Sequence, residues 1–227
     1  MNILVLACAA AKNMTAQPLL HPTNGNIAEI VARPRLRGPN AYQPDSNVGQ
    51  GYPGTWRDYI VQGNTQVQLP GHLLPAAQLY TNPKYMELQA YCGVACFYIF
   101  SAGWGIVRSD YGLPKYDITF SPAAGGTSLY KKRNYPTPHY NDCNHLITLP
   151  LTPTDHIYFL GGKSYWDPFA NLTNGTLAQR FIIYPQPEAL PAGINLQLCA
   201  GLNNMNWYYQ CATNIMTQGH ADHLVFP

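Results

Sequence analysis

Short apolar runs, separated by polar stretches rich in glycine and proline, dominate the pattern along the chain. Residues 3–7, 95–100 and 157–160 are each an unbroken apolar run. Runs of this length without polar alternation predict strands that are buried on both faces of a sheet. Residues 181–184 form a fourth run, which predicts either a strand or the end of a helix that begins near Thr176.

The clearest helical pattern covers residues 76–93. Thr81 or Asn82 can cap a helix there, Pro83 suits its first turn, and Gly93 is a typical stop. A helix that leads directly into a buried strand is what a parallel α/β layer requires. The pattern therefore predicts an α/β fold.

Weaker patterns lie nearer the amino terminus. Residues 26–32 predict one short helix, which Asn24 or Asn26 can cap. Residues 56–61 resume regular structure, and residues 65–69 alternate in the way typical of a strand.

Length and composition narrow the fold class. A chain of 227 residues fits one domain, and its 20 prolines and 19 glycines indicate long ordered loops rather than a helical bundle. We therefore expect a single α/β domain over residues 1–227 with a mostly parallel central sheet and flanking helices. Residues 16–70 are expected to form a loop-rich insertion, and residues 121–150 a basic and aromatic binding segment.

The amino-terminal residues 1–12 imitate an export signal. They lack a basic region before the apolar run, however, and Cys8 comes too early for a signal peptide of normal length. No later stretch approaches the roughly 20 apolar residues of a membrane span. We therefore expect a cytoplasmic protein with no membrane partner.

The six cysteines, at positions 8, 92, 96, 143, 199 and 211, have poor spacing for zinc. Disulfides would suit them only in an exported protein. We expect neither a bound metal nor a cofactor.

Charge is concentrated just after the apolar run at 95–100. The glycine-containing stretch 101–105 breaks that run, and Arg108, Asp110, Lys115 and Asp117 follow in a chain that is only 11% charged. Open α/β sheets place their ligand crevice beyond the carboxyl ends of their strands. A solvated loop is the alternative interpretation.

The candidate catalytic groups are the two carboxylates of this loop. Asp110 follows Arg108 closely and precedes Tyr111, so we expect it near the end of the central strand, projecting into the crevice. Asp117 precedes a run that begins another strand, where it would serve structure as well as activity. Asp110 is the preferred catalytic residue.

Residues that follow the predicted strands supply a candidate substrate pocket. Small residues with a lysine after the first strand let backbone amides and one cation face an anionic group. Aromatic side chains at the later strand ends provide surfaces for stacking. The candidate substrate-binding residues are Cys8, Lys12, Ser101, Ala102, Gly103, Trp104, Tyr111, Tyr116, Lys163, Tyr165 and Trp166.

Two basic segments are candidates for binding nucleic acid, although the net charge of +2 is too small to indicate it. Arg33, Arg35 and Arg37 occupy alternate positions in a segment that two prolines hold extended, which predicts an arm with its three guanidinium groups on one side. Lys131, Lys132 and Arg133 lie among tyrosines, a combination that suits phosphate contacts and base stacking. Solvated surface is the alternative for both segments.

The carboxyl-terminal tail holds His220 and Asp222. These side chains could form a general base and its orienting group, but they face the same way only if the chain there is extended.

Four features together resemble one family. They are the first strand leading to Cys8 and Lys12, Tyr80 before the capped helix, Ser101-Ala102-Gly103-Trp104-Gly105-Ile106, and Tyr116-Asp117-Ile118-Thr119. Gly161-Gly162 with Tyr165 fits a later glycine–tyrosine pattern. The match covers roughly residues 1–12 and 75–170. It resembles the small bacterial and phage proteins of the Ser-Ala-x-x-Gly-Leu type, distant relatives of the bacterial peroxide-resistance protein and of domains that accompany base-modifying enzymes.

The resemblance implies an α/β fold and a link to nucleic acids or nucleobases. In the family the second motif is usually Ser-Ala-Lys-Tyr-Gly-Leu, so Gly103 and Trp104 replace its lysine and tyrosine here. A role for that lysine therefore does not carry over. Some proteins of the wider group resemble DNA glycosylases, including anti-phage enzymes that excise glucosylated hydroxymethylcytosine.

Three functions fit these features. The first is a DNA glycosylase of anti-phage defence, which acts on double-stranded DNA, flips out a modified base and leaves an abasic site, with no obligate protein partner. The second is a non-catalytic nucleic-acid-binding protein of stress response or defence, which needs the basic segments but not the aspartates. The third is a nucleotide or nucleoside N-glycoside hydrolase, which needs the aspartates but not the basic segments.

Overall fold

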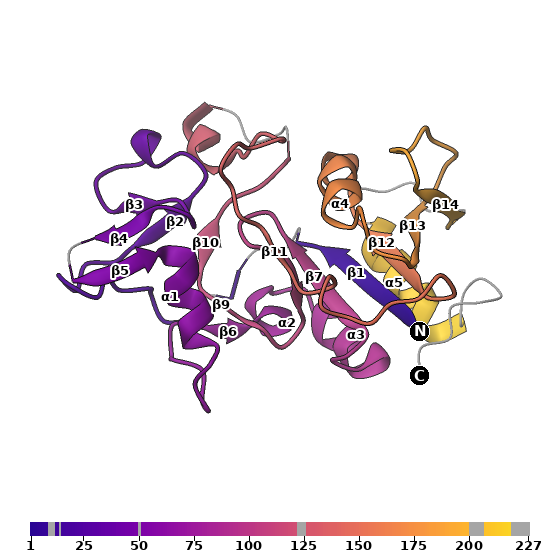
Figure 1. Ribbon diagram of the computed structural model, residues 1–227, viewed down its shortest axis with the longest axis horizontal. Coiled ribbons are helices and arrows are strands. Elements are labelled where there is room, and N and C mark those ends of the chain that lie inside the picture. The colour runs from indigo at the N-terminus through magenta and orange to yellow at the C-terminus, as the bar shows by residue number, and fades with distance from the viewer. Residues whose placement is uncertain (9–11, 14, 50, 122–125, 200–206, 219–227) are drawn as a thin grey trace.

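The centre of the computed structural model is a seven-stranded sheet in the order β11-β8-β7-β1-β12-β13-β14 (Figure 1). The structure describes residues 1–8, 12–13, 15–49, 51–121, 126–199 and 207–218. The strands of this sheet are β1 (Asn2–Ala7), β7 (Phe97–Ser101), β8 (Gly105–Arg108), β11 (Cys143–Asn144), β12 (His156–Leu160), β13 (Gln179–Tyr184) and β14 (Asn195–Leu198).

Strand β1 lies between β7 and β12 and is parallel to both. Parallel pairing continues from β12 through β13 to β14, whereas β8 returns antiparallel to β7. Residues 3–7 of β1 are at most 1% exposed, which is the burial expected of a strand covered on both faces. The predicted α/β fold with a mostly parallel central sheet is confirmed, as are the strands expected at 3–7 and 157–160. Of the two alternatives for residues 181–184, the structure has the strand.

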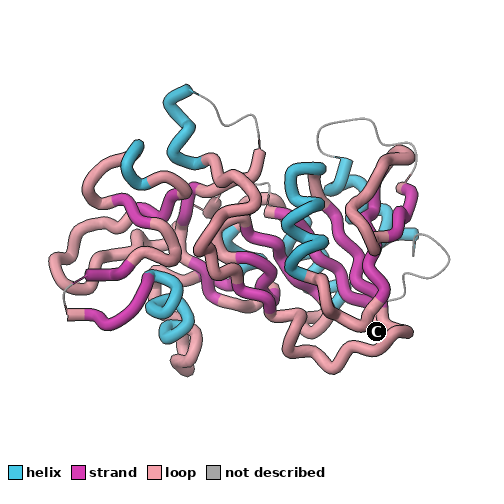
Figure 2. Tube along the Cα trace, turned by 45° about the horizontal axis from the view of Figure 1, so that its top comes forward, coloured by secondary structure: helices cyan, strands magenta, loops and turns pink. Residues whose placement is uncertain are grey.

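Helices flank the sheet on both sides. The five α-helices among the described residues are α1 (Trp56–Gly63), α2 (Ala76–Leu79), α3 (Lys84–Cys92), α4 (Trp166–Leu172) and α5 (Trp207–Gln218). Helix α4 lies across one face of the sheet (Figure 2). Phe169 of this helix stacks on Phe159 of β12 at a centroid distance of 4.7 Å. Helices α3 and α5 pack against each other, and the hydroxyl groups of Tyr85 and Tyr209 are in hydrogen-bond contact.

The expected helix over residues 76–93 is interrupted at Tyr80. This residue is extended, pairs with Lys12 in an isolated bridge, and buries its ring in the core. The second helix, α3, begins at Lys84 with Pro83 at its N-cap, so neither Thr81 nor Asn82 occupies the cap position. Asn82 Oδ1 still accepts a hydrogen bond from the Lys84 amide at 3.0 Å. The helix stops at Gly93, whose φ of +76° is readily available to glycine.

The insertion at 16–70 carries more regular structure than expected and lies to one side of the central sheet (Figure 1). The short strands in it and beside it are β2 (Glu29–Val31), β3 (Ala41–Tyr42), β4 (Asn47–Gly49), β5 (Tyr52–Thr55), β6 (Leu74–Pro75), β9 (Gly112–Leu113) and β10 (Tyr116–Asp117). Strand β2 lies between β10 and β3 in a three-stranded sheet.

Two sequence-based expectations in the insertion are wrong. Residues 26–32 contain strand β2 rather than a helix, because Ile30 and Val31 pair with the strand at Tyr116 and Asp117. Two adjacent β-branched residues suit such pairing better than a helix interior. Residues 65–69 form turns after α1 and no strand, and Val67 is fully exposed.

Gly105, at the start of β8, is expected to be essential for stability. A Cβ atom there would lie 2.2 Å from the carbonyl oxygen of Cys143, and the backbone has φ of +91°. We expect Gly105→Ala to lower the free energy of unfolding by about 3 kcal/mol or more, since the positive φ alone costs roughly 1–2 kcal/mol. Gly93→Ala is the matched control, because its positive φ has no atom within 4 Å of the added Cβ. Equal losses for the two variants in urea unfolding would contradict the clash.

Candidate functional site

The carboxyl ends of three adjacent parallel strands bring polar side chains to one place. Cys8 follows β1, Ser101 ends β7, and Tyr165 ends the short 3₁₀ helix η3 (Lys163–Tyr165) after β12. The Tyr165 hydroxyl lies 3.2 Å from Cys8 Sγ and donates a hydrogen bond to the Cys8 carbonyl at 3.0 Å. The strand order thus assembles a cluster at the edge where open α/β sheets place ligands.

Two further tyrosines complete this thiol–tyrosine cluster. Tyr116 of β10 donates to Cys8 Sγ at 3.3 Å and accepts from Ser101 Oγ at 2.8 Å. The hydroxyl of Tyr80 lies 2.6 Å from that of Tyr116. All five side chains are buried, and their polar groups satisfy one another.

Burial keeps the phenol groups of this cluster protonated to higher pH than in exposed tyrosines. It raises the pKa of Tyr80, Tyr116 and Tyr165 well above the ordinary value, with Cys8 adding to the shift in each case. A neutral network of donors and acceptors positions its members rather than exchanging protons with solvent. We therefore assign the cluster to positioning.

The loop 102–104 after β7 is bound by side chains on all of its backbone groups. The Ala102 amide donates to Cys8 Sγ at 3.2 Å, while the next two amides donate to Ser101 Oγ at 3.3 and 3.1 Å. The carbonyl oxygens of residues 102, 103 and 104 accept from Arg133 at 2.8 Å, Tyr140 at 3.0 Å and Arg57 at 3.3 Å.

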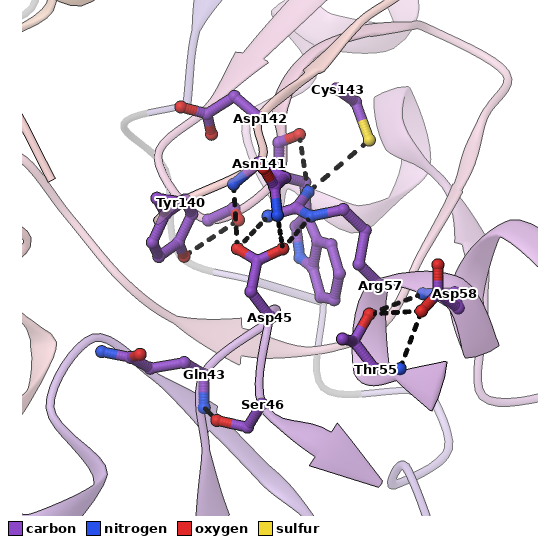
Figure 3. A network of polar contacts seen from close by, with 12 residues as sticks. Gln43, Asp45, Ser46, Thr55, Arg57, Asp58, Tyr140, Asn141, Asp142 and Cys143 are labelled. Carbon is purple, nitrogen blue, oxygen red and sulfur yellow. Dashed lines mark hydrogen bonds and ion pairs between the residues drawn. The ribbon is translucent and has the colours of Figure 1, made fainter. Parts of the chain in front are cut away.

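Both arginines of this loop support are buried and are held by partly buried carboxylates. Arg57 forms a bidentate pair with Asp45 at 2.8 and 3.1 Å, in the network drawn in Figure 3. Arg133 forms a second bidentate pair with Asp142, at 2.8 and 2.6 Å. A capping box between Thr55 and Asp58 starts helix α1 and fixes the turn that carries Arg57 (Figure 3).

A pocket of about 950 Å³ lies beside the thiol–tyrosine cluster. Tyr116 belongs to both, because its hydroxyl is inside the cluster while the residue also lines the pocket. The other lining residues come from the chain after β1, from the insertion, from the segment around β10 and from η2 (Gly126–Lys131). They are Lys12, Ala16, Pro18, Leu19, Ile27, Ala28, Glu29, Ile30, Val31, Arg37, Lys115, Asp117, Tyr130 and Lys131.

Ion pairs order part of the pocket lining. The Asp117 carboxylate lies 2.8 Å from Lys131 Nζ and accepts a hydrogen bond from the Tyr130 hydroxyl at 3.3 Å. Arg37 pairs with Glu29 through Nε and Nη2. These contacts fix the two acidic groups of the described lining, Asp117 and Glu29, in the pocket wall.

The two basic segments meet at the rim of this pocket. The 3₁₀ helix η1 (Pro34–Leu36) packs against η2, and the Arg33 amide donates to the carbonyl of Tyr130 at 2.9 Å. Arg33 Nε also donates to the Lys132 carbonyl at 3.1 Å. Segments a hundred residues apart in the sequence therefore present Arg35, Lys131 and Lys132 on one part of the molecule.

The expected position of Asp110 is wrong. Because β8 is antiparallel to β7, Arg108 lies opposite Tyr98, and the Ser109 amide donates to the Phe97 carbonyl. The hairpin therefore carries Asp110 back to the amino end of β7, away from the cluster. There it forms an exposed pair with Arg108 at 2.5 Å. Asp117, and not Asp110, lines the pocket.

The expectations for the basic segments are also corrected in part. Arg133 is only 4% exposed and paired with Asp142, so it cannot contact a phosphate group. Residues 33–37 are not an extended arm, because Pro34–Leu36 form a 3₁₀ turn that does not place alternate side chains on one side. Arg33 is half-buried, while Arg35 and Arg37 are exposed.

The remaining predicted substrate-binding residues either lie in the buried loop that supports the site or pack elsewhere, away from the pocket. Ser101, Ala102, Gly103 and Trp104 are buried, with their backbone groups bound as above, so they support the site without lining the pocket. Tyr111 packs against His145 at 4.6 Å. Lys163 pairs with Glu188, and Trp166 packs against Tyr184. His220 and Asp222 lie outside the described residues.

Sequence reasoning missed the contribution of the insertion. Glu29, Ile30 and Val31 line the pocket because β2 pairs with β10. The β-branched pair at 30–31 was the available signal for that strand. Nothing in the sequence indicated that this strand would stand beside Tyr116 and Asp117.

Comparison with known proteins gives no match: no family model, no curated protein and no solved structure is significantly similar to this chain. In the described part of the chain, no group of three or more His, Cys, Asp or Glu side chains is placed to hold a metal ion. A helix long and apolar enough to cross a membrane is also absent from the described residues. The family resemblance therefore stays a prediction.

The corrected role of Arg133 can be tested by stability. We expect Arg133→Met to lower the free energy of unfolding by about 3 kcal/mol or more, because it leaves the buried Asp142 carboxylate unpaired. Lys132→Met is the matched control one residue away, and its half-exposed side chain should cost less than about 1 kcal/mol. Equal, small losses in urea unfolding would mean that Arg133 does not support the loop.

Proposed function

We propose that this protein is a DNA glycosylase that removes a modified base and uses Asp117 as its carboxylate. The observation that carries the proposal is one pocket with Asp117 in its wall and the two basic segments at its rim. A flipped nucleotide needs both features, since the pocket receives the base while the cations hold the phosphates on either side. The anti-phage role implied by the resemblance belongs to the proposal.

Asp117 is suited to stabilise the cationic sugar of the reaction. As the bond between C1′ and the base nitrogen breaks, positive charge develops on the sugar, and a carboxylate beside it lowers the barrier. Water adds to C1′ as hydroxide, and its proton passes to the departing base. Lys131 and Tyr130 hold the Asp117 carboxylate in place before the substrate arrives.

The pocket is suited to a bulky base. Its volume of about 950 Å³ is near the top of the range of roughly 300–1,000 Å³ for small-molecule sites. Tyr116 and Tyr130 offer aromatic surfaces, and Leu19, Ile27 and Ile30 offer apolar ones. A pocket of this size and lining is suited to accommodate a base enlarged by a sugar, as in glucosylated hydroxymethylcytosine.

A nucleotide N-glycoside hydrolase is the second candidate. Arg37 and Lys131 are already paired with Glu29 and Asp117, and Arg133 is buried, so less free charge is left for a long DNA backbone than the sequence indicated. The same carboxylate and pocket would serve a free nucleotide. The two functions differ in whether released base comes from polymer or monomer.

We expect Asp117→Asn to reduce base release by a factor of about 10² to 10⁴, because the amide keeps the shape but loses the negative charge. Asp110→Asn should leave turnover near normal, since Asp110 lies at the other end of β7. Mass spectrometry of bases released from phage DNA that carries modified cytosine measures both. Release that survives Asp117→Asn but not Asp110→Asn would reverse the assignment, and no release by the unaltered protein would refute the glycosylase.

DNA affinity should depend on the rim cations Arg35, which is exposed, and Lys132, which is half-exposed. We expect Arg35→Ala with Lys132→Ala to weaken duplex binding and to reduce the slope of log affinity against log salt by about 2. Lys84→Ala is the control, because Lys84 starts helix α3 and pairs there with Glu87. Fluorescence anisotropy at increasing salt gives the slopes. An unchanged slope in the double variant would place DNA binding elsewhere.

A further inference from the structure

Two lysines of the pocket have no acidic partner. Lys12 and Lys115 both line the pocket and are half-buried, and among the described residues neither has a carboxylate within ion-pair distance. The other two cations of the lining, Arg37 and Lys131, are neutralised by Glu29 and Asp117. The described lining therefore carries an excess of two positive charges, both of them lysine.

Lys12 is held in place by aromatic rings. Its Nζ atom lies 4.4 Å from the centroid of Tyr116 and 5.9 Å from that of Tyr80, which also pairs with it in an isolated bridge. Contact with an aromatic face stabilises a cation by about 0.5–1 kcal/mol but neutralises none of its charge. Since both rings are fixed by the thiol–tyrosine cluster, the ammonium group stays beside the pocket in a defined place.

We propose that Lys12 and Lys115 form a phosphate subsite, so that the pocket takes a nucleotide and discriminates against the neutral nucleoside. This inference rests on the proposed function for the base, and it adds the group that the two lysines recognise. Lysine binds phosphate as a compact point charge. Half-burial strengthens the attraction, because water screens the charges less than at an open surface.

The phosphate can come from two sources. In DNA it is the phosphodiester next to the flipped nucleotide, whereas in a free nucleotide it is the terminal monoester. Both present the same anionic oxygens to Lys12 and Lys115. The two sources are separated by probes that carry one or the other.

The first arm of the test compares cytidine with cytidine 5′-monophosphate by isothermal titration calorimetry. If the monoester is the source, the monophosphate binds at least tenfold more tightly than cytidine. Lys12→Met and Lys115→Met should each remove most of that difference, while Lys84→Met keeps it. Glu29→Gln should increase it, because it removes a negative charge from the pocket lining. Thermal unfolding checks that each variant is folded.

The second arm uses a short oligonucleotide that carries one neutral methylphosphonate next to the target base. If the phosphodiester is the source, this change weakens binding at least tenfold to the unaltered protein and little to the two lysine variants. A preference in either arm that both lysine variants abolish supports the proposal. It is overturned if neither arm shows a preference, or if a preference persists in both variants.

Failure of this inference can be told from failure of the proposed function. Base release without any phosphate preference would sink the subsite and leave the glycosylase intact. A phosphate preference without release from either DNA or monomer would sink the proposed function and leave the subsite intact.

Discussion

The site depends on the complete hydrogen bonding of the loop that follows β7. The amides of residues 102–104 donate hydrogen bonds to Cys8 and Ser101. The carbonyl oxygens of the same residues accept hydrogen bonds from Arg133, Tyr140 and Arg57. A buried backbone group without a partner costs roughly 1–3 kcal/mol, so these bonds to all six backbone groups of the loop stabilise its conformation. Because the partners come from four separate parts of the chain, that one loop ties the strand ends to the insertion and to the segment before β11.

This hydrogen bonding accounts for several of the few charged residues in the chain. Two arginines and two aspartates form largely buried bidentate pairs, and these pairs support the loop. Removing one partner of such a pair strongly destabilises the fold, because it leaves the other charge unpaired. The intact pair contributes little net stability and mainly fixes the position of the arginine. Four further cations, Lys12, Arg37, Lys115 and Lys131, line one pocket. Charge near the sheet edge therefore supports the loop and, under the proposed function, also contacts the ligand.

Tyr116 connects these two tasks. Its hydroxyl completes the thiol–tyrosine cluster, and the Lys12 ammonium group lies over its ring. The next residue, Asp117, lines the pocket. A Cβ on Gly103 would lie 3.0 Å from the Tyr116 ring, so the loop and the ring pack directly together. The position of the proposed catalytic group therefore follows from the packing of a tyrosine that does not itself react. Rigid support of this kind is what positioning of a reacting group requires.

The sequence by itself determined the buried strands, the α/β class and the stop of α3, because these follow from apolar runs and from glycine at the end of a helical pattern. It placed Cys8, Ser101 and Tyr165 after predicted strands, but the sheet order β7-β1-β12 that brings them together came from the structure. It did not determine which aspartate faces the pocket. That was decided by strand direction, since β8 turns back along β7 and carries Asp110 to the opposite end of the sheet. The sequence also could not show that Arg133 is buried in an ion pair while Lys132 is half-exposed, because both are cations in the same short run. Strands, helix ends and turns depend on neighbouring residues and can be predicted from the sequence. Strand direction, ion-pair partners and pocket walls depend on contacts between distant segments, which only the tertiary structure sets.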